Sequence, residues 1–305
     1  MRVHVLGNAC IDTTFRLRRF PLPGETLNAS SVTDGLGGKG ANQAIAASRI
    51  GVPVKLWTAL GRDAAGAWIR DVLAGESLDL EVAEFGLPSD RSTIMVDAVG
   101  ENLIVSGVAC AQAFDPVGQT ATVQNFEPGD IVVLQGNLRT EATASCLRLA
   151  REKGAKTVLN LSPINDIFGL DLRLADILIV NRSEARTLGA QSDVEIAAAR
   201  LVNRGAPLVI VTLGSEGCLW LSAGGQTIRR LPASKVVAVD TSGAGDVFCG
   251  SFVGALANGL DVISSLKVAL AAASVAVTRP GTLASCPSAA EMAAILDGMK
   301  ANHDG

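Results

Sequence analysis

Two carboxylates flank a run of small residues in the segment DTSGAGD, which extends from Asp240 to Asp246. The segment leads into VFCGSFVGALANG, whose apolar residues recur at helical spacing. A small-residue turn that opens a helix leaves backbone N–H groups unpaired, and these groups favour an anion. Gly243, Ala244 and Gly245 would supply them. Asp246, in the first turn beside such an anion, is better suited to be a base than a ligand, although a plain helix cap is the alternative.

A second glycine-rich stretch, GLGGKGAN, covers residues 35–42. It matches GxGxxG, but the dinucleotide-binding fingerprint also needs an apolar strand directly before it, which is missing here. It is not a Walker A loop either, because no Ser or Thr follows the lysine. A flexible backbone beside a cation, leading into a helix that begins near Asn42, would let a polyol approach backbone N–H groups and the Asn42 amide.

Two further polar segments directly follow apolar runs. In NRSE, Asn181 and Glu184 share one face of a helix start and are suited to orient water on a hydrated Mg²⁺. A capping residue followed by Glu in the first turn gives the same pattern. TLGSEG, residues 212–217, has the pattern of a turn between two strands, and TRPG, residues 278–281, has the Pro and Gly of a helix end.

Composition narrows the possible classes of protein. The chain has 305 residues, of which 48% are hydrophobic and 18% charged, as in a globular protein with a large core. Its net charge of −4 gives no support for binding to nucleic acid or an anionic membrane. Only 4% of residues are aromatic and none is Tyr, which argues against a base-stacking surface.

The cysteines and the apolar segments indicate the cellular compartment of the protein. Six widely scattered cysteines without metal-ligand spacing indicate reduced, buried thiols. The first residues contain too short an apolar run for a signal peptide, and the Ala-rich segment 268–277 is too short to span a membrane. We therefore expect a cytoplasmic protein that binds neither nucleic acid nor membranes.

Strands that alternate with helices predict a doubly wound α/β fold, in which helices cover both faces of a mostly parallel sheet. Apolar runs predict strands over residues 3–6, 54–60, 131–135, 157–161, 177–180, 208–213 and 218–221. Helices are predicted over residues 41–51, 64–73, 141–153, 192–204, 246–258 and 262–277. Residues 13–34 and 92–108 instead alternate in polarity around turns, which predicts exposed antiparallel strands in a small sheet inserted into a single domain of residues 1–305.

The polar residues that follow the strands should lie together. Ligands of parallel α/β folds bind at the carboxyl ends of the strands. Asp12, residues 135–137, Asn181 and residues 212–214 directly follow apolar runs. We therefore expect these positions to converge.

Together and in this order, the motifs resemble the PfkB, or ribokinase-like, family of carbohydrate kinases, and ribokinases are the most similar group within it. The resemblance covers essentially the whole chain. GGKGANQA, residues 37–44, is similar to the first signature of the family, and DTSGAGD to the second. The start from Gly7 to Asp12, NRSE, TLGSEG and AVTRPG fall where the family has corresponding elements.

The resemblance implies an ATP-dependent sugar kinase, which transfers the γ-phosphoryl group to a primary hydroxyl of a pentose, ketose or related small sugar. It makes Asp246 the base and the N–H groups of residues 243–245 the anion hole, in keeping with phosphoryl transfer by positioning and electrostatic stabilisation. The positions that match the family's sugar ligands are Asp12, Gly38, Lys39, Asn42 and Asn137, together with Asp246.

The resemblance also implies cofactors and an assembly. It assigns Asn181, Thr212, Gly214, Ser215 and Gly217 to the nucleotide, and Asn181 and Glu184, acting through water, to Mg²⁺. A K⁺ site would comprise Asp240, Ser242, Ala276, Arg279, Gly281 and Ser285, mostly through backbone carbonyls. The small sheet would be a lid that closes over the sugar and pairs two subunits into a homodimer.

Two positions depart from the ribokinase pattern. Cys10 stands where ribokinases have an Asn, and Asn137 stands where they have a Glu. These changes alter which sugar hydroxyls find partners, and an unpaired buried hydroxyl costs about 1–3 kcal/mol. Ribose therefore remains a candidate but is not the expected best substrate. A nucleoside kinase of the same family and a non-catalytic sugar- or nucleotide-binding regulator are the alternatives, with a dinucleotide dehydrogenase more distant.

Overall fold

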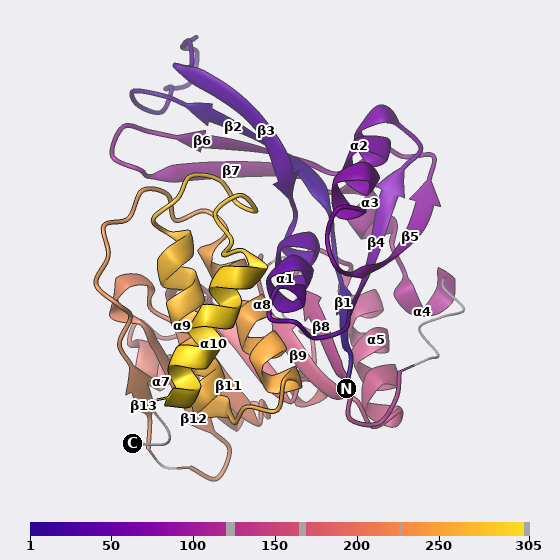
Figure 1. Ribbon diagram of the computed structural model, residues 1–305, viewed down its shortest axis with the longest axis vertical. Helices are drawn as coiled ribbons and strands as arrows, with labels where there is room; N and C mark the ends of the chain where they lie inside the picture. Colours follow the sequence, from indigo (N-terminus) through magenta and orange to yellow (C-terminus); the bar gives the residue numbers. More distant parts are fainter. Residues whose placement is uncertain (120–125, 165–168, 226, 302–305) are drawn as a thin grey trace.

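Two separate sheets organise the chain in the computed structural model, which describes residues 1–119, 126–164, 169–225 and 227–301. The large sheet has the strand order β13-β12-β11-β10-β9-β8-β1-β4-β5 (Figure 1). Its strands are β1 (Val3–Leu6), β4 (Val54–Gly61), β5 (Asp79–Phe85), β8 (Ile131–Gln135), β9 (Lys156–Asn160), β10 (Ile177–Asn181), β11 (Leu208–Thr212), β12 (Cys218–Ser222) and β13 (Arg229–Leu231).

The large sheet is parallel from β5 to β11, and only β12 and β13 run antiparallel to their neighbours. Every residue of β1 and β8 is buried, as expected of strands that are covered on both faces. The predicted strands are confirmed, with ends that differ by one or two residues. The sequence patterns did not predict β5 and β13, because these edge strands carry charged residues and are largely half-buried or exposed.

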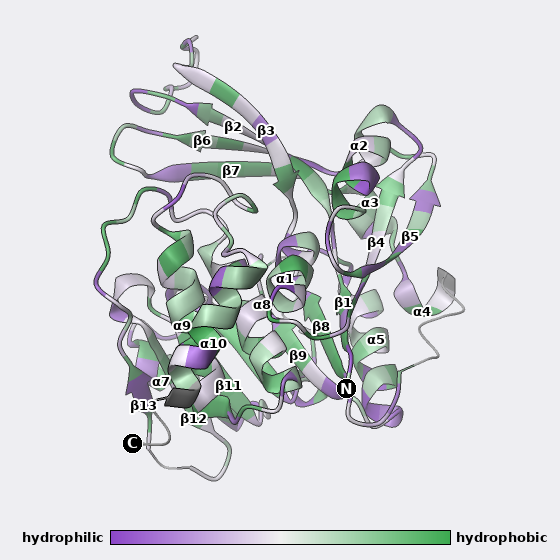
Figure 2. Ribbon diagram, in the orientation of Figure 1, coloured by the Kyte–Doolittle hydropathy of each residue, from purple (hydrophilic) through white to green (hydrophobic). Residues whose placement is uncertain are grey.

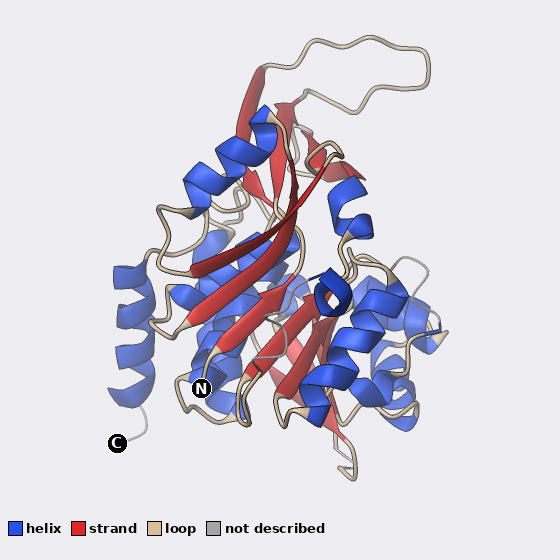
Figure 3. Ribbon diagram, turned by 90° about the vertical axis from the view of Figure 1, so that its right-hand side faces the viewer, coloured by secondary structure: helices blue, strands red, loops and turns tan. Residues whose placement is uncertain are grey.

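Helices pack on both faces of the large sheet, which confirms the doubly wound fold. One face is covered by α1 (Lys39–Ser48), α2 (Ala64–Leu73), α8 (Ala244–Ala257), α9 (Val262–Ala276) and α10 (Ala289–Ala301). The other is covered by α3 (Ala109–Ala113), α5 (Thr140–Glu152), α6 (Arg182–Gly189) and α7 (Val194–Asn203), with α4 (Pro116–Gln119) beside α5. Figure 3 shows helices on either side of the strands, and Figure 2 shows how apolar the enclosed strands are.

Two of these helices, α1 and α8, approach each other closely because glycines lie in their interface. A Cβ atom added to Gly250 in α8 would lie 2.3 Å from the carbonyl oxygen of Gln43 in α1. One added to Gly254 would lie 2.9 Å from the Ile50 side chain. This close packing brings the first turn of α8 within reach of the polar residues of α1.

The small sheet stands above one end of the large sheet, with strand order β3-β2-β6-β7 (Figure 1). Its strands are β2 (Cys10–Arg16), β3 (Ser31–Gly37), β6 (Arg91–Val96) and β7 (Asn102–Gly107). The two predicted hairpins are antiparallel, but their central strands β2 and β6 are parallel to each other. The reason is that β2 and β6 follow β1 and β5, which leave the large sheet in the same direction.

The lower end of the small sheet includes Asp12. The sequence placed this residue at the mouth of the first strand, whereas it lies inside β2, opposite Gly35 and Ser92. Asp12 therefore reaches the carboxyl edge of the large sheet from the small sheet. None of the helices in the described part of the chain is long and apolar enough to cross a membrane.

Candidate active site

Asp246 lies in the first turn of α8, and three donor side chains surround its carboxylate. Gln43 Nε2 donates to Oδ1 over 3.0 Å, and Asn42 Nδ2 donates to Oδ2 over 3.2 Å. The Lys39 ammonium lies 3.5 Å from Oδ1. Asp246 is only 5% exposed, so its charge needs such compensation. Each carboxylate oxygen still has lone-pair capacity with which to accept a proton.

The start of α8 has the geometry of an anion site. Gly243 is the N-cap residue, with φ of 75°, and a Cβ there would lie 2.8 Å from the carbonyl oxygen of Thr282. The N–H groups of Gly243 and Gly245 have no partner among the described residues, whereas Ala244 N–H reaches the Thr241 carbonyl at 3.4 Å. A Cβ on Gly245 would meet nothing within 4 Å. Two unpaired N–H groups therefore lie within three residues of Asp246, and open space adjoins Gly245.

A buried amide network fixes the orientation of Gln43, a residue that the sequence analysis did not single out. Gln135 Nε2 donates to Gln43 Oε1 over 2.9 Å, so the Gln43 amide nitrogen points the other way. That nitrogen donates to Asn160 Oδ1 over 2.9 Å as well as to Asp246. Gln135 and Asn160 end neighbouring strands, so the rule that ligand-binding residues follow parallel strands pointed to this edge.

The lower end of the small sheet contributes a second buried carboxylate, Asp12. Its Oδ1 accepts a hydrogen bond from the Cys10 thiol over 3.2 Å, and Cys10 Sγ lies 3.6 Å from Ser92 Oγ. Burial raises the pKa of Asp12 and the nearby charge of Asp246 raises it further, although hydrogen bonds from neighbouring side chains act against both effects. A Cβ on Gly37 would lie 2.0 Å from Asp12 Oδ2, so any side chain there would displace the Asp12 carboxylate.

The start of α1, where Gly38 is the N-cap and Lys39 the first residue, lies at the same place. Gly38 has φ of 94°, and a Cβ there would lie 2.7 Å from the carbonyl oxygen of Asn8. Burial opposes the charge on Lys39, but the carboxylates of Asp246 and Glu184 outweigh it and raise the pKa of this lysine. Lys39 is therefore protonated, and its ammonium lies against the carboxylate of Asp246.

Several buried amide oxygens in this region lack a hydrogen-bond donor. They belong to Asn8, Asn42, Gln135 and Asn137. Leaving a buried acceptor unpaired costs roughly 1–3 kcal/mol, so native proteins rarely keep several together without a ligand. The hydroxyl groups of a bound polyol are suitable donors. Asn137, which was predicted to contact sugar, is thus buried with its side-chain oxygen unpaired.

Asn181 and Glu184 form a complete capping box at the start of α6. Glu184 N–H donates to Asn181 Oδ1 over 2.9 Å, and Asn181 N–H donates to Glu184 Oε2 over 2.7 Å. The capping interpretation is thus correct for both side chains. Glu184 also acts electrostatically on Lys39, which places its carboxylate near the site around Asp246.

The residues predicted to contact a nucleotide lie on neighbouring strand ends. Thr212 ends β11 directly beside Asn181, and the following turn contains Gly214 and Ser215, both exposed, before Gly217. Arg182 forms an ion pair with Glu216 and donates to the Leu213 carbonyl over 3.2 Å. The sequence analysis did not identify Arg182, which joins the two segments into one surface.

The six residues predicted to bind K⁺ lie in two neighbouring segments, 239–243 and 276–285. The carboxylate of Asp240 accepts from the N–H groups of Ser242 over 2.9 Å and Gly281 over 3.1 Å. Arg16 Nη2, from β2, also lies 3.3 Å from it, a contact that the sequence patterns did not predict. The buried Ser242 Oγ has no partner. At the other predicted positions, the Arg279 N–H donates a hydrogen bond to the Ala276 carbonyl, and Ser285 Oγ donates one to the Thr282 carbonyl.

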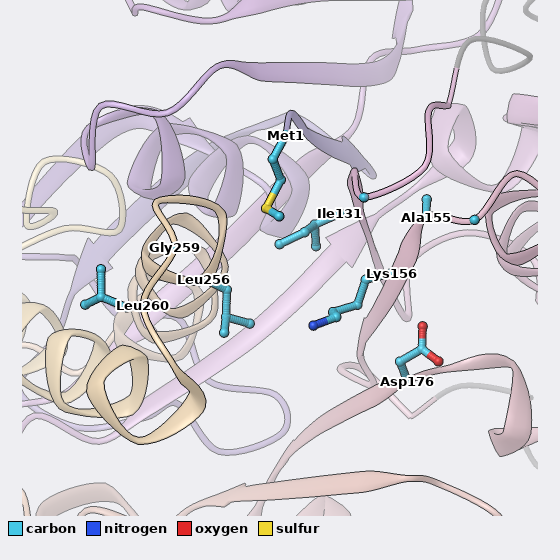
Figure 4. Close-up of a pocket in the computed structure, with 10 residues that line it drawn as sticks. Met1, Ile131, Ala155, Lys156, Asp176, Leu256, Gly259 and Leu260 are labelled. Carbon is cyan, nitrogen blue, oxygen red and sulfur yellow. The ribbon is translucent and has the colours of Figure 1, made fainter.

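A hollow of about 530 Å³ lies elsewhere, where β8 and β9 begin (Figure 4). Lys156 and Asp176 line it together with Met1, Ile131, Leu256 and Leu260. It is at the opposite edge of the sheet from Asp246, and Asp176 is held by the Thr157 N–H at 2.8 Å. The side chains that converge at the carboxyl edge, and not this hollow, define the candidate site.

Comparisons with known proteins agree with this geometry. The sequence model for "pfkB family carbohydrate kinase" matches residues 2–289. The chain is 30% identical to the ribokinase of Schizosaccharomyces pombe over 311 residues, covering 96% of each protein. It is 31% identical to the deoxyribokinase of Salmonella typhi over 298 residues, covering 94% of this chain and 96% of the relative.

A solved structure extends the similarity to the fold. The Arabidopsis thaliana ribokinase, solved with ribose and ATP, matches with a TM-score of 0.82 at 27% identity, covering 96% of this chain and 98% of that chain. The family match extends over nearly the whole chain and includes the segments that build the site around Asp246. The chain therefore belongs to the pfkB family of carbohydrate kinases.

Proposed function

We propose that this carbohydrate kinase transfers the γ-phosphoryl group of ATP to a primary hydroxyl of a pentose, ketose or related small sugar, with Asp246 as the base. One observation carries the proposal: a buried carboxylate lies beside free N–H groups at the start of α8. The carboxylate suits a proton and the N–H groups suit an anion. The ribokinase and deoxyribokinase relatives favour a pentose as the acceptor.

The sugar would be held between the two sheets. Asp12 accepts hydrogen bonds from sugar hydroxyls, and the unpaired oxygens of Asn42 and Asn137 accept others. Asp246 takes the proton of the primary hydroxyl as that oxygen attacks the phosphoryl group. The N–H groups of Gly243 and Gly245 stabilise the charge on the transferred group, and the protonated Lys39 lies beside Asp246.

ATP would lie along the neighbouring strand ends. Its ligands would be Asn181, Thr212, Gly214, Ser215 and Gly217. Glu184 and Asn181 would hold Mg²⁺ through water, and the ion would neutralise charge on the phosphates. Support comes from the register of Thr212 beside Asn181 and from the Arg182–Glu216 ion pair that joins the two segments.

We also propose a cytoplasmic location. All six cysteines are free thiols and all are buried, as the sequence predicted. Free thiols persist in reducing compartments, of which the cytoplasm is the usual one. Fractionation of cells that make the protein tests this location, and recovery outside the cytoplasm would contradict it.

Asp246→Asn should lower kcat by about 10²- to 10⁴-fold, because the amide cannot take the proton. ATP affinity, measured by calorimetry, should stay nearly unchanged. The assay measures ADP release with Mg²⁺ and K⁺ across pentoses, hexoses, ketoses, polyols and nucleosides. Asp71→Asn, an exposed change on α2, is the matched control and should behave like wild type. Normal turnover by Asp246→Asn would mean that Asp246 is not the base.

Replacing K⁺ by Na⁺ at constant ionic strength should lower activity. We propose that Asp240, Ser242 and the nearby carbonyls hold K⁺, which would steady the turn before the anion hole. Arg16 already lies against Asp240, so the guanidinium competes with the ion for that carboxylate. Arg16→Gln should therefore reduce the K⁺ concentration that gives half-maximal activity. Equal rates in K⁺ and Na⁺, for both the wild type and Arg16→Gln, would contradict the proposal that the enzyme requires K⁺.

A homodimer through the small sheet is the proposed assembly. All six residues of the edge strand β7 are exposed, including Leu103, Ile104 and Val105. An exposed apolar edge strand is a template for pairing, and a second copy would cover it. Ile104→Glu should raise the dimer dissociation constant by at least about tenfold, as measured by sedimentation equilibrium. Ile196→Glu, on α7 and equally exposed at 51%, is the control. A monomeric wild type would contradict the proposal.

Asp12→Asn should stabilise the fold at neutral pH while weakening the enzyme. Because the folded state raises the pKa of Asp12, the ionised carboxylate destabilises the fold at pH values above that raised pKa. This destabilisation disappears at pH values below the pKa of Asp12 in the unfolded chain, which is about 4. The variant should thus melt above wild type at pH 7.5, with the difference shrinking towards pH 4. Loss of the charged acceptor should lower kcat/KM roughly 10- to 100-fold. A lower melting temperature at pH 7.5 would show that the charge stabilises the fold. Asp71→Asn again serves as the control.

A further inference from the structure

One ion pair joins the small sheet to the turn that precedes α8. Arg16, the last residue of β2, places Nη2 3.3 Å from Oδ2 of Asp240, which is 224 positions away in the sequence. The Asp240 side chain is only 4% exposed, whereas that of Arg16 is 37% exposed. The arginine therefore reaches from the end of its strand to a buried carboxylate, and its charge compensates a group that is costly to bury alone.

The Asp240 carboxylate in turn holds the segments around the proposed anion hole. Its Oδ1 accepts from the Ser242 N–H over 2.9 Å, and its Oδ2 accepts from the Gly281 N–H over 3.1 Å. The next residue, Gly243, is packed so closely on Thr282 that a Cβ would lie 2.8 Å from the Thr282 carbonyl oxygen. A displaced Asp240 carboxylate would therefore shift the N–H groups that are proposed to hold the phosphoryl group.

The strand that ends at Arg16 also carries Asp12, the proposed sugar ligand. Residues two apart on a strand share a face, so Asp12 and Arg16 lie on the same face of β2, roughly 13 Å apart at about 3.3 Å per residue. The strand pairs with β3 from Cys10 to Arg16 and with β6 from Ile11 to Arg16. Because β2 is hydrogen-bonded on both sides, the position of Asp12 determines that of Arg16.

A second contact joins the small sheet to the same region. Thr282 Oγ1 donates to the carbonyl of Leu36 in β3 over 3.3 Å, and Leu36 lies opposite Ile11 of β2. Figure 1 shows the segment between α9 and α10, which contains Thr282, beneath the small sheet. The turn that leads to Gly243 and the segment packed on Gly243 are thus both attached to the small sheet.

We propose that Arg16 is a positioning residue that couples the sugar site to the anion hole. A sugar that fixes β2 through Asp12 would also fix Asp240 through Arg16. The inference rests on the proposed function, because it takes Asp12 to hold the sugar and residues 243–245 to hold the phosphoryl group. Coupling is reciprocal, so a nucleotide tightens sugar binding by the same factor, which is typically about 5- to 150-fold.

Calorimetry measures this coupling factor. It is the ratio of the dissociation constants of D-ribose without and with AMP-PNP and Mg²⁺, measured in Na⁺ buffer so that K⁺ does not compete for Asp240. Wild type should give a factor of at least about five, and Arg16→Gln should lower it to about one. Arg16→Lys keeps the charge and should retain most of the coupling. Arg18→Gln, an exposed change just after β2, is the matched control and should behave like wild type.

Hydrogen exchange tests the same contact without a ligand. The N–H groups of Ser242 and Gly281 donate to Asp240, so Arg16→Gln should speed exchange at both amides although neither residue contacts Arg16 in the sequence. The Gly66 N–H, which donates to Asp63 at the start of α2, is the internal reference and should exchange at the wild-type rate. A general loss of stability would instead speed exchange at all three amides.

Several outcomes would overturn the role of Arg16 while the kinase assignment stands. They are a coupling factor of one in wild type, an unchanged factor in Arg16→Gln, and unchanged exchange at Ser242 and Gly281. Faster exchange at Gly66 as well would reduce Arg16 to a structural residue. If Arg16→Gln does not fold, Arg16→Met keeps the length of the side chain and replaces it in both tests.

The proposed function is tested separately, by ADP release. If D-ribose does not bind, the sugar that wild type turns over fastest in that assay replaces it in the calorimetry. Turnover of no sugar in the panel would overturn the proposed function, and the inference with it.

Discussion

The whole site depends on one buried carboxylate whose charge is compensated by a helix far away in sequence. Asp246 belongs to α8, yet Lys39, Asn42 and Gln43, which lie around it, all belong to α1. Their hydrogen bonds form only because α1 and α8 pack with a glycine, Gly250, at the contact. A side chain there would separate the helices and leave the carboxylate buried without partners, which is strongly unfavourable.

The small sheet is tied to this site by the topology of the large one. β2 continues from β1 and β6 continues from β5, so the lower end of the small sheet lies at the carboxyl edge where Asp246 is. Asp12 and Cys10 come from β2, and Arg16, farther along the same strand, reaches Asp240. A shift of the small sheet would thus act on the proposed sugar site and on the turn before α8 together.

The sequence predicted the fold well because buried parallel strands are apolar runs and surface helices are periodic. It missed β5 and β13, whose charged residues hide the strand pattern at the sheet edges. The motifs identified Asp246 and Asn42, which lie in glycine-rich signatures with recognisable spacing. They did not indicate the Gln43–Asn160 bond or the Arg16–Asp240 pair, because such contacts join residues 117 and 224 positions apart. A local sequence pattern does not indicate which side chains meet when they are so far apart in the sequence.

The two buried carboxylates near the proposed sugar site are better explained by binding than by stability. Asp12 and Asp246 repel each other, and burial raises the pKa of Asp12. Unpaired oxygens of Asn42 and Asn137 add to the cost in the free protein. A polyol would supply hydroxyl donors to all of these acceptors at once, which relieves the cost only in the complex. In the proposed complex, the free energy that burial of these unpaired groups costs the fold would be recovered on binding. A substrate lacking donors at these positions would recover less of it.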